Sequence, residues 1–143
     1  MPTKDFSKQG KLNRAAGARF ELKVREDLEK MGWTVSKWMN SIDNEKNKII
    51  PAKRKFNPFL KTMIIGTGFP DFIAFKKTEN GFEVIGVEVK TKGLLDKIER
   101  GQALWLIKNK IFSRLLIARK KQQGKRIIVE YEDVEEKYKK YLE

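Results

Sequence analysis

Two acidic residues and a lysine stand at the ends of two neighbouring apolar segments. Asp71 follows Pro70, and Glu88 and Lys90 stand two residues apart in the valine- and isoleucine-rich segment 82–91. Two carboxylates that lie close together repel each other unless a cation lies between them, and Mg²⁺ is held in proteins by one or two carboxylates, waters and phosphate oxygens. A neighbouring lysine can hold a water or stabilise charge on a phosphate. Residues of these types indicate hydrolysis of a phosphodiester bond.

A predicted β-hairpin would bring these three side chains together. Asn80-Gly81, between two apolar and β-branched segments, is the strongest short-range signal for a hairpin. Because alternate residues of a strand point to the same face, Glu88 and Lys90 project side by side. Asp71 stands where the first strand begins, next to a proline that cannot donate to the sheet. We therefore predict one site that contains Asp71, Glu88 and Lys90.

Segment 14–31 is predicted to form a helix with one apolar face. Glu21 lies at the edge of that face, where an acidic side chain either meets a partner or reaches solvent. Gly17 falls on the same face and would allow another backbone to approach closely. The apolar positions, at spacings of four, four and three, are Phe20, Val24, Leu28 and Met31.

Segment 95–112 is predicted to form a second helix. Ile98, Gln102 and Trp105 share one face, so the amide of Gln102 lies among apolar neighbours and needs a partner. A glutamine bonded to backbone at the edge of the core is the alternative to a role in the site. The apolar run 105–107 would either join the core or form an interface with a second copy of the chain.

The remaining segments predict a single mixed α/β domain over 14–143, preceded by a flexible basic tail over 1–13. The order of elements gives an α/β fold with a central mixed β-sheet flanked by helices. The other predicted elements are strands over 33–39, 115–118 and 127–131, a basic turn over 120–125, and a helix over 134–142 capped by Asp133.

Segment 40–60 is predicted to be a long loop that contacts nucleic acid. Three consecutive basic residues stand beside Phe56 and Phe59 in this segment, and basic groups interleaved with aromatics suit phosphate contact and base stacking. A solvated charge run over a small apolar cluster is the alternative. The candidate nucleic-acid-binding residues are Arg14, Lys53, Arg54, Lys55 and Lys92.

Composition favours a polyanionic partner and a metal held by oxygen. The chain has 143 residues and a net charge of +13, which suits nucleic acid or an anionic membrane. No apolar run approaches the roughly 18 residues of a membrane span, and no signal-peptide pattern is present, so we expect a soluble, intracellular (cytoplasmic) protein without a membrane partner. The sequence has no cysteine and no histidine. Thiolate and imidazole ligands are therefore excluded, which favours Mg²⁺ or Mn²⁺.

The pattern Pro70-Asp71 followed by Glu88-Val89-Lys90 resembles the PD-(D/E)XK nuclease superfamily, which has the restriction-endonuclease-like fold. With Glu21 upstream and Gln102 downstream, the order is similar to that of archaeal Holliday junction resolvases and related small nucleases. The resemblance implies a Mg²⁺-dependent endonuclease that hydrolyses DNA phosphodiester bonds and works as a homodimer. It allows a junction resolvase, a flap or single-strand nuclease, or a restriction-type enzyme.

The resemblance also implies a role for each site residue. Glu21, Asp71 and Glu88 would bind the metal, directly or through water. Lys90 would position or activate the attacking water. Gln102 would orient Lys90 or a phosphate.

The resemblance covers about residues 14–120, and segment 40–60 is longer than the corresponding connection of the archaeal resolvases. The preferred DNA structure therefore stays open. A non-catalytic nucleic-acid-binding module of the same fold is the alternative, because a chain of net charge +13 binds DNA whatever its active site does. A polybasic membrane-surface protein is a third interpretation, against which stands the lack of a basic amphipathic helix with an aromatic face.

Overall fold

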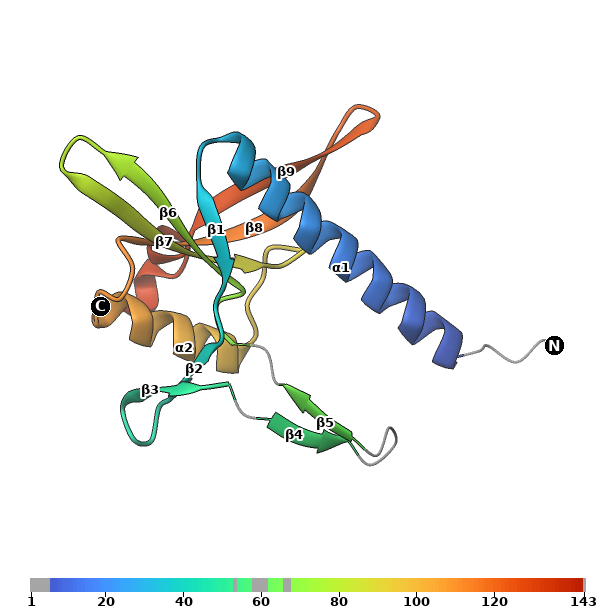
Figure 1. The fold of residues 1–143 in the computed structure, drawn as a ribbon, viewed down its shortest axis with the longest axis horizontal. Coiled ribbons are helices and arrows are strands. Elements are labelled where there is room, and N and C mark those ends of the chain that lie inside the picture. Colours follow the sequence, from blue (N-terminus) through green and yellow to red (C-terminus); the bar gives the residue numbers. More distant parts are fainter. Residues whose placement is uncertain (1–5, 53, 58–61, 66–67, 143) are drawn as a thin grey trace.

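The computed structural model describes residues 6–52, 54–57, 62–65 and 68–142, and these form a mixed α/β fold (Figure 1). None of the described helices is long and apolar enough to cross a membrane. In chain order the elements are α1 (Phe6–Lys30), β1 (Thr34–Lys37), β2 (Asn40–Asp43), β3 (Lys48–Pro51), β4 (Arg54–Asn57), β5 (Thr62–Ile65), β6 (Phe72–Thr78), β7 (Gly81–Val89), α2 (Lys97–Lys108), β8 (Arg114–Gln123), β9 (Arg126–Asp133), α3 (Val134–Lys137) and a short 3₁₀ helix (Lys139–Tyr141).

A five-stranded mixed sheet forms the centre of the molecule, in the order β1-β6-β7-β8-β9. β7 and β8 are parallel, and the other neighbouring strands are antiparallel. The predicted α/β fold with a central mixed sheet and flanking helices is thereby confirmed. The predicted hairpin is also confirmed, since Thr78 pairs with Gly81 across the turn between β6 and β7.

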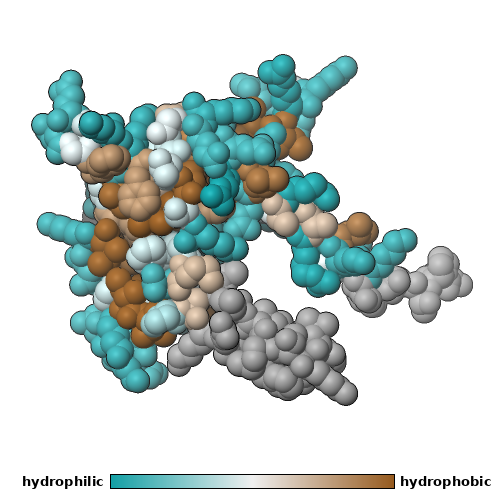
Figure 2. Space-filling model, in the orientation of Figure 1, coloured by the Kyte–Doolittle hydropathy of each residue, from teal (hydrophilic) through white to brown (hydrophobic). Residues whose placement is uncertain are grey.

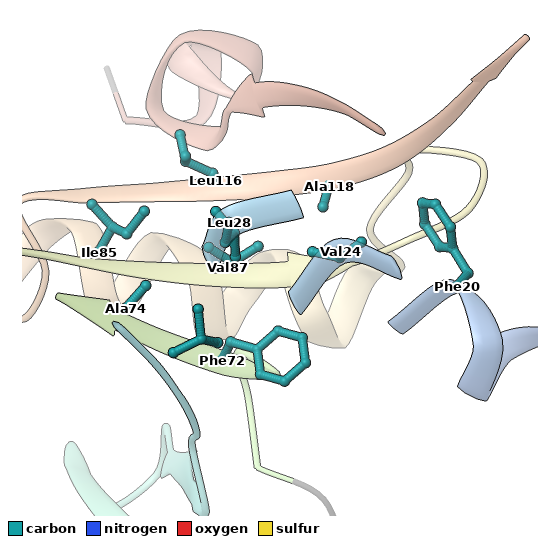
Figure 3. Packing of buried hydrophobic residues seen from close by; sticks show 10 residues of the cluster. Phe20, Val24, Leu28, Phe72, Ala74, Ile85, Val87, Leu116 and Ala118 are labelled. Carbon is teal, nitrogen blue, oxygen red and sulfur yellow. The ribbon is translucent and has the colours of Figure 1, made fainter. Parts of the chain in front are cut away.

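The two faces of the sheet carry separate apolar cores, because alternate residues of each strand point to opposite faces. Ile85 and Val87 of β7 belong to the core beneath α1, where the predicted α1 stripe packs as expected except for exposed Met31. Leu115 and Ile117 of β8 belong to the other core, with α2 and α3. The buried residues of the first core are Phe20, Val24, Leu28, Val35, Phe72, Ala74, Ile85, Val87, Leu116 and Ala118 (Figure 3).

The first helix begins at Phe6, so residues 6–13 are helical where a flexible tail was predicted, and residues 1–5 lie outside the described part of the chain. Once a helix is nucleated by packing, each further residue adds one hydrogen bond without a new nucleation cost. Lysine, glutamine and leucine in this segment are good helix formers. The N-terminal half of α1 consequently projects beyond the sheet (Figure 1).

Segment 40–60 is not one long loop. Residues 40–51 form the antiparallel hairpin β2–β3, and β4 pairs with β5 beyond it. The polar run that was interpreted as loop contains the first turn, where Asp43 Oδ1 accepts hydrogen bonds from the backbone of Glu45 and Lys46. Short side-chain-capped turns of this kind allow strands in a segment that looks irregular from its composition.

The C-terminal elements also differ from the prediction. β8 continues to Gln123, so most of segment 120–125 is strand, and the turn falls at Gly124. Cross-strand ion pairs such as Arg119–Glu130 (2.8 Å) favour the longer hairpin with β9. Asp133 caps α3 as predicted, but α3 ends at Lys137 and a 3₁₀ turn follows.

Gly86 keeps the centre of β7 close to the loop that leads into the site. A Cβ atom at this position would lie 2.9 Å from both the Phe112 ring and Pro70 Cγ. We predict that Gly86→Ala lowers the free energy of unfolding by about 1–3 kcal/mol through overpacking, measured by chemical denaturation. Gly101→Ala, within α2, is the matched control. The nearest neighbour of a Cβ atom there, Asn44 Nδ2, is 3.7 Å away, so this variant should be neutral or stabilising. Equal stabilities of the two variants would contradict this packing account.

Candidate active site

The β6–β7 hairpin brings Asp71 and Glu88 face to face. Phe72 pairs with Val87, so the antiparallel register places Asp71 opposite Glu88. The Asp71 backbone N donates a hydrogen bond to Glu88 Oε1 (3.1 Å), and the Val89 backbone N donates one to Asp71 Oδ2 (2.8 Å). Each carboxylate is thus held by the backbone of the opposite strand. The predicted approach of these two acids is what the structure shows.

Glu88 is 5 % exposed and is the one buried charged residue among those the structure describes. Burial raises the pKa of Glu88 well above its usual range, and the negative charges of Asp71 and Glu99 raise it further. A carboxylate pair in these surroundings is favourable only when one member holds a proton or when a cation lies beside both.

Lys90 is anchored beside this pair. Its Nζ forms an ion pair with Glu99 Oε2 and lies 4.0 Å from Glu88 Oε2. Burial lowers the pKa of the Lys90 ammonium, but the hydrogen bond and the charge of Glu99, together with Glu88, outweigh this effect and leave the pKa raised. Lys90 is therefore a fixed positive charge at the site.

Glu99 is the site residue that the sequence reasoning missed. It is the third residue of a capping box at the start of α2, where the Glu99 backbone N donates to Asp96 Oδ1 (2.8 Å) and the Asp96 backbone N donates to Glu99 Oε1 (3.0 Å). The other carboxylate oxygen of Glu99 binds Lys90. The spacing Asp96-x-x-Glu99 is a capping-box signal that is visible in the sequence.

Gln102 has a hydrogen-bond partner on β2, and its predicted role in orienting Lys90 or a phosphate stays a prediction. Its Nε2 donates a hydrogen bond to Ser41 Oγ (3.2 Å) on β2, because the core-facing side of α2 runs through Ala103 and Leu106 instead. Ile98, which was expected on the same apolar face, is 74 % exposed.

Glu21 lies on the wall of a cavity of about 270 Å³ that Asp71 and Lys90 also line. Burial raises the pKa of Glu21, the charge of Asp71 raises it further, and the charge of Lys37 lowers it. Gly17 faces open space rather than another backbone, contrary to the prediction. The residues that line the cavity are Gly17, Phe20, Glu21, Asp71, Val89, Lys90 and Thr91.

The donor set of this site fits a hard divalent cation held by few protein ligands. Within the described residues, no three acidic side chains lie close enough together to form a metal-binding group. Asp71 and Glu88 remain as an adjacent oxygen pair. Mg²⁺ is usually bound by one or two carboxylates, with waters and substrate phosphates in its other positions, so this pair suits it. The part of Glu21 as a ligand stays a prediction.

The predicted nucleic-acid-binding residues lie on several different elements. Arg14 is exposed on α1 seven residues, or about two turns, before Glu21, and Lys92 is exposed just after Lys90. Lys37, at the end of β1, is an additional basic residue, and its positive charge lowers the pKa of Glu21. Arg54 and Lys55 lie on β4, and Lys53 lies outside the described residues.

No family model, curated protein or solved structure matches this chain. The resemblance to nucleases therefore stays a prediction from the motif residues.

The raised pKa of Glu88 predicts that the metal-free protein loses folding stability as the pH rises. The unfolded chain loses this proton near the ordinary pKa of 4.5, whereas the folded chain holds it to higher pH. Below about pH 4.5 Glu88 is protonated in both states, and the free energy of unfolding is unaffected. As the pH rises towards the pKa of Glu88 in the folded chain, the free energy of unfolding falls by at most about 1.4 kcal/mol per pH unit.

Glu88→Gln removes the titrating group and keeps an oxygen that can accept the hydrogen bond from the Asp71 backbone. In EDTA we expect this variant to melt several degrees above wild type at pH 8, with the difference shrinking as the pH falls towards 5. Glu26→Gln, an exposed glutamate on α1, is the control. A constant difference between Glu88→Gln and wild type across this pH range would show that the pKa of Glu88 is not raised.

Proposed function

We propose that this chain is a metal-dependent endonuclease that hydrolyses DNA phosphodiester bonds and has the restriction-endonuclease-like fold of the PD-(D/E)XK nucleases. The observation that carries the proposal is the Asp71–Glu88 pair, with Lys90 fixed next to it at the edge of a cavity. Oxygen pairs of this kind suit Mg²⁺ or Mn²⁺, and a lysine at this distance suits a reacting phosphate or water.

A purely structural role explains the pair poorly. Apolar residues of similar volume at the ends of two buried strands are usually as stabilising as buried charges, or more so. The hairpin instead places two acids opposite each other and buries Glu88. Such an arrangement, which lowers stability, is typical of sites whose chemistry requires it.

The residues of the chain divide the work between them. Asp71 and Glu88 would hold the cation, which when bound supplies a water of lowered pKa and stabilises negative charge on the phosphate. Lys90, held by Glu99, would orient the attacking water or a phosphate oxygen. Glu21, on the cavity wall, would accept hydrogen bonds from waters at the metal, and Lys37 would contribute positive charge next to it.

The arrangement of the sheet supports the same proposal. Asp71 precedes the second strand of the sheet order, and Glu88 and Lys90 lie at the end of the third, with α1 earlier in the chain and α2 between β7 and β8. This placement of the motif residues on neighbouring strands supports the resemblance, although a fold by itself does not determine function. A homodimer remains part of the proposal. Leu106 of the run 105–107 is buried in the core, so it is not available for the interface.

A nucleic-acid-binding module without catalysis is the second candidate. Two observations favour it: the net charge of +13, and the lack of a three-carboxylate group among the described residues. In this case the acidic pair would serve only to fix the hairpin.

Cleavage assays separate the two candidates. We predict that the wild-type chain cuts DNA with Mg²⁺ or Mn²⁺ and not with EDTA. Asp71→Asn and Glu88→Gln should each lower the rate by at least about 100-fold, because each removes a charge from the cation site. Both variants should still bind DNA in EDTA. The control variant Glu79→Gln, at an exposed position in the turn between β6 and β7, should cut normally.

Labelled four-way junction, linear duplex and single-stranded DNA serve as parallel substrates. Paired symmetrical nicks confined to the junction would indicate a resolvase. Normal cutting by Asp71→Asn would overturn the site assignment, and binding without cutting of any substrate would favour the non-catalytic module.

A further inference from the structure

A groove between α1 and the β8–β9 hairpin leads away from the candidate active site. It consists of two cavities, of about 140 and about 580 Å³, beyond the cavity that contains Asp71. Phe20 lines both the active-site cavity and the first groove cavity, and Lys23 and Ile127 line both groove cavities. The three cavities are therefore neighbours in one row. We call the two outer ones the basic groove.

The basic groove is strongly positive where it meets the active site. Its first cavity is lined by Arg19, Lys23 and Lys120, and the described residues that line it include no acid. The second cavity adds Lys30 and Arg126.

Two acids also line the second cavity. Asp27 accepts a hydrogen bond from the Tyr131 hydroxyl (2.7 Å), and Glu26 is exposed at its side. The acidic pair at the active site thus lies at one end of a row of cations, a distribution that suits a chain of phosphates with one of them at the metal.

The floor of the groove indicates which part of a nucleic acid it would contact. The Phe20 ring is buried at the end of the first core (Figure 3), and Lys120 Nζ lies 5.5 Å from the ring centroid. Stacking of bases needs an exposed aromatic face, which Phe20 does not offer. Ile127 is 41 % exposed between the two cavities. The tip of the hairpin beyond it is covered with hydrophilic side chains (Figure 2). These surroundings suit contact with phosphates, independent of base sequence.

We propose that the basic groove binds the phosphate backbone of the nucleic-acid strand that adjoins the scissile phosphate. The strand then leaves the active site between α1 and the β8–β9 hairpin. The position of the scissile phosphate in this proposal rests on the proposed function. The charge of the groove argues against a second copy of this chain as its occupant, because like-charged grooves repel. The row of cavities is also longer than a single free phosphate requires.

Salt-dependent binding tests the groove without any need for cleavage. The triple variant Arg19→Gln, Lys23→Gln, Lys120→Gln removes three groove cations. The matched control, Lys77→Gln, Lys108→Gln, Lys139→Gln, removes three exposed lysines outside the residues that line the groove. Binding of a labelled duplex and of the matching single strand is measured in EDTA over a range of salt concentrations, after thermal melting has shown that both triples are folded.

We expect the groove triple to reduce the slope of log K against log salt by about 2–3, and the control triple by less than about 1. Equal slopes for the two triples would overturn the groove. If the groove triple loses affinity but the wild-type chain cuts no substrate, the proposed role of the groove in binding is supported and the proposed nuclease activity is wrong. If the chain cuts DNA and both triples bind alike, the proposed nuclease activity is supported and the proposed role of the groove is wrong.

A crosslink tests the path of the strand. The chain has no cysteine, so Ile127→Cys gives a unique thiol to which a photo-crosslinker can be attached. Lys77→Cys, at the opposite end of β6 from Asp71, is the control. We expect crosslinking to bound DNA from position 127 to exceed that from position 77 at least tenfold. Similar yields from the two positions would contradict the proposed path.

Discussion

The register between β6 and β7 is the constraint on which the rest of the molecule depends. It places Asp71 opposite Glu88, and each carboxylate accepts a hydrogen bond from the backbone of the other strand. A shift of one residue would leave Asp71 and Glu88 on opposite faces of the sheet, with one of them directed into the apolar core beneath α1. The Asn80-Gly81 turn sets the register at one end, and Gly86 keeps the strand close to Pro70 at the other.

Electrostatics then organise the surroundings of this pair. The Lys90 ammonium lies near Glu88 but forms its closer ion pair with Glu99. The capping box of α2 fixes the position of Glu99. A helix terminus therefore fixes a charge at the site, which links the start of α2 to the end of β7. Beyond Phe20 the sign of the surface reverses, and the groove beside α1 is basic. A polyanion would meet a cation-binding pair and a row of positive charges side by side.

The approach of the site residues could be predicted from the sequence, whereas several of the elements and contacts around them could not. Local signals were sufficient for the β6–β7 hairpin and for the approach of Asp71, Glu88 and Lys90, because alternation and turn chemistry are short-range properties. The partner of Gln102 depends on how α2 rotates over the sheet, which spacing alone did not determine. The hairpin in segment 40–51 was concealed by its polar turn, and the helical residues 6–13 lacked an apolar stripe. Glu99 was visible as a capping residue, but its contact with Lys90 is tertiary.

The central claim is that Asp71 and Glu88 together hold a divalent cation. Electron paramagnetic resonance of Mn²⁺, titrated with and without an uncleavable phosphorothioate duplex, tests it most directly. The account predicts a saturable Mn²⁺ site in the wild-type chain that Asp71→Asn and Glu88→Gln each abolish and that Glu79→Gln, in the turn between β6 and β7, leaves intact. Mn²⁺ binding that is absent from the wild type under both conditions, or unchanged in both site variants, would contradict it.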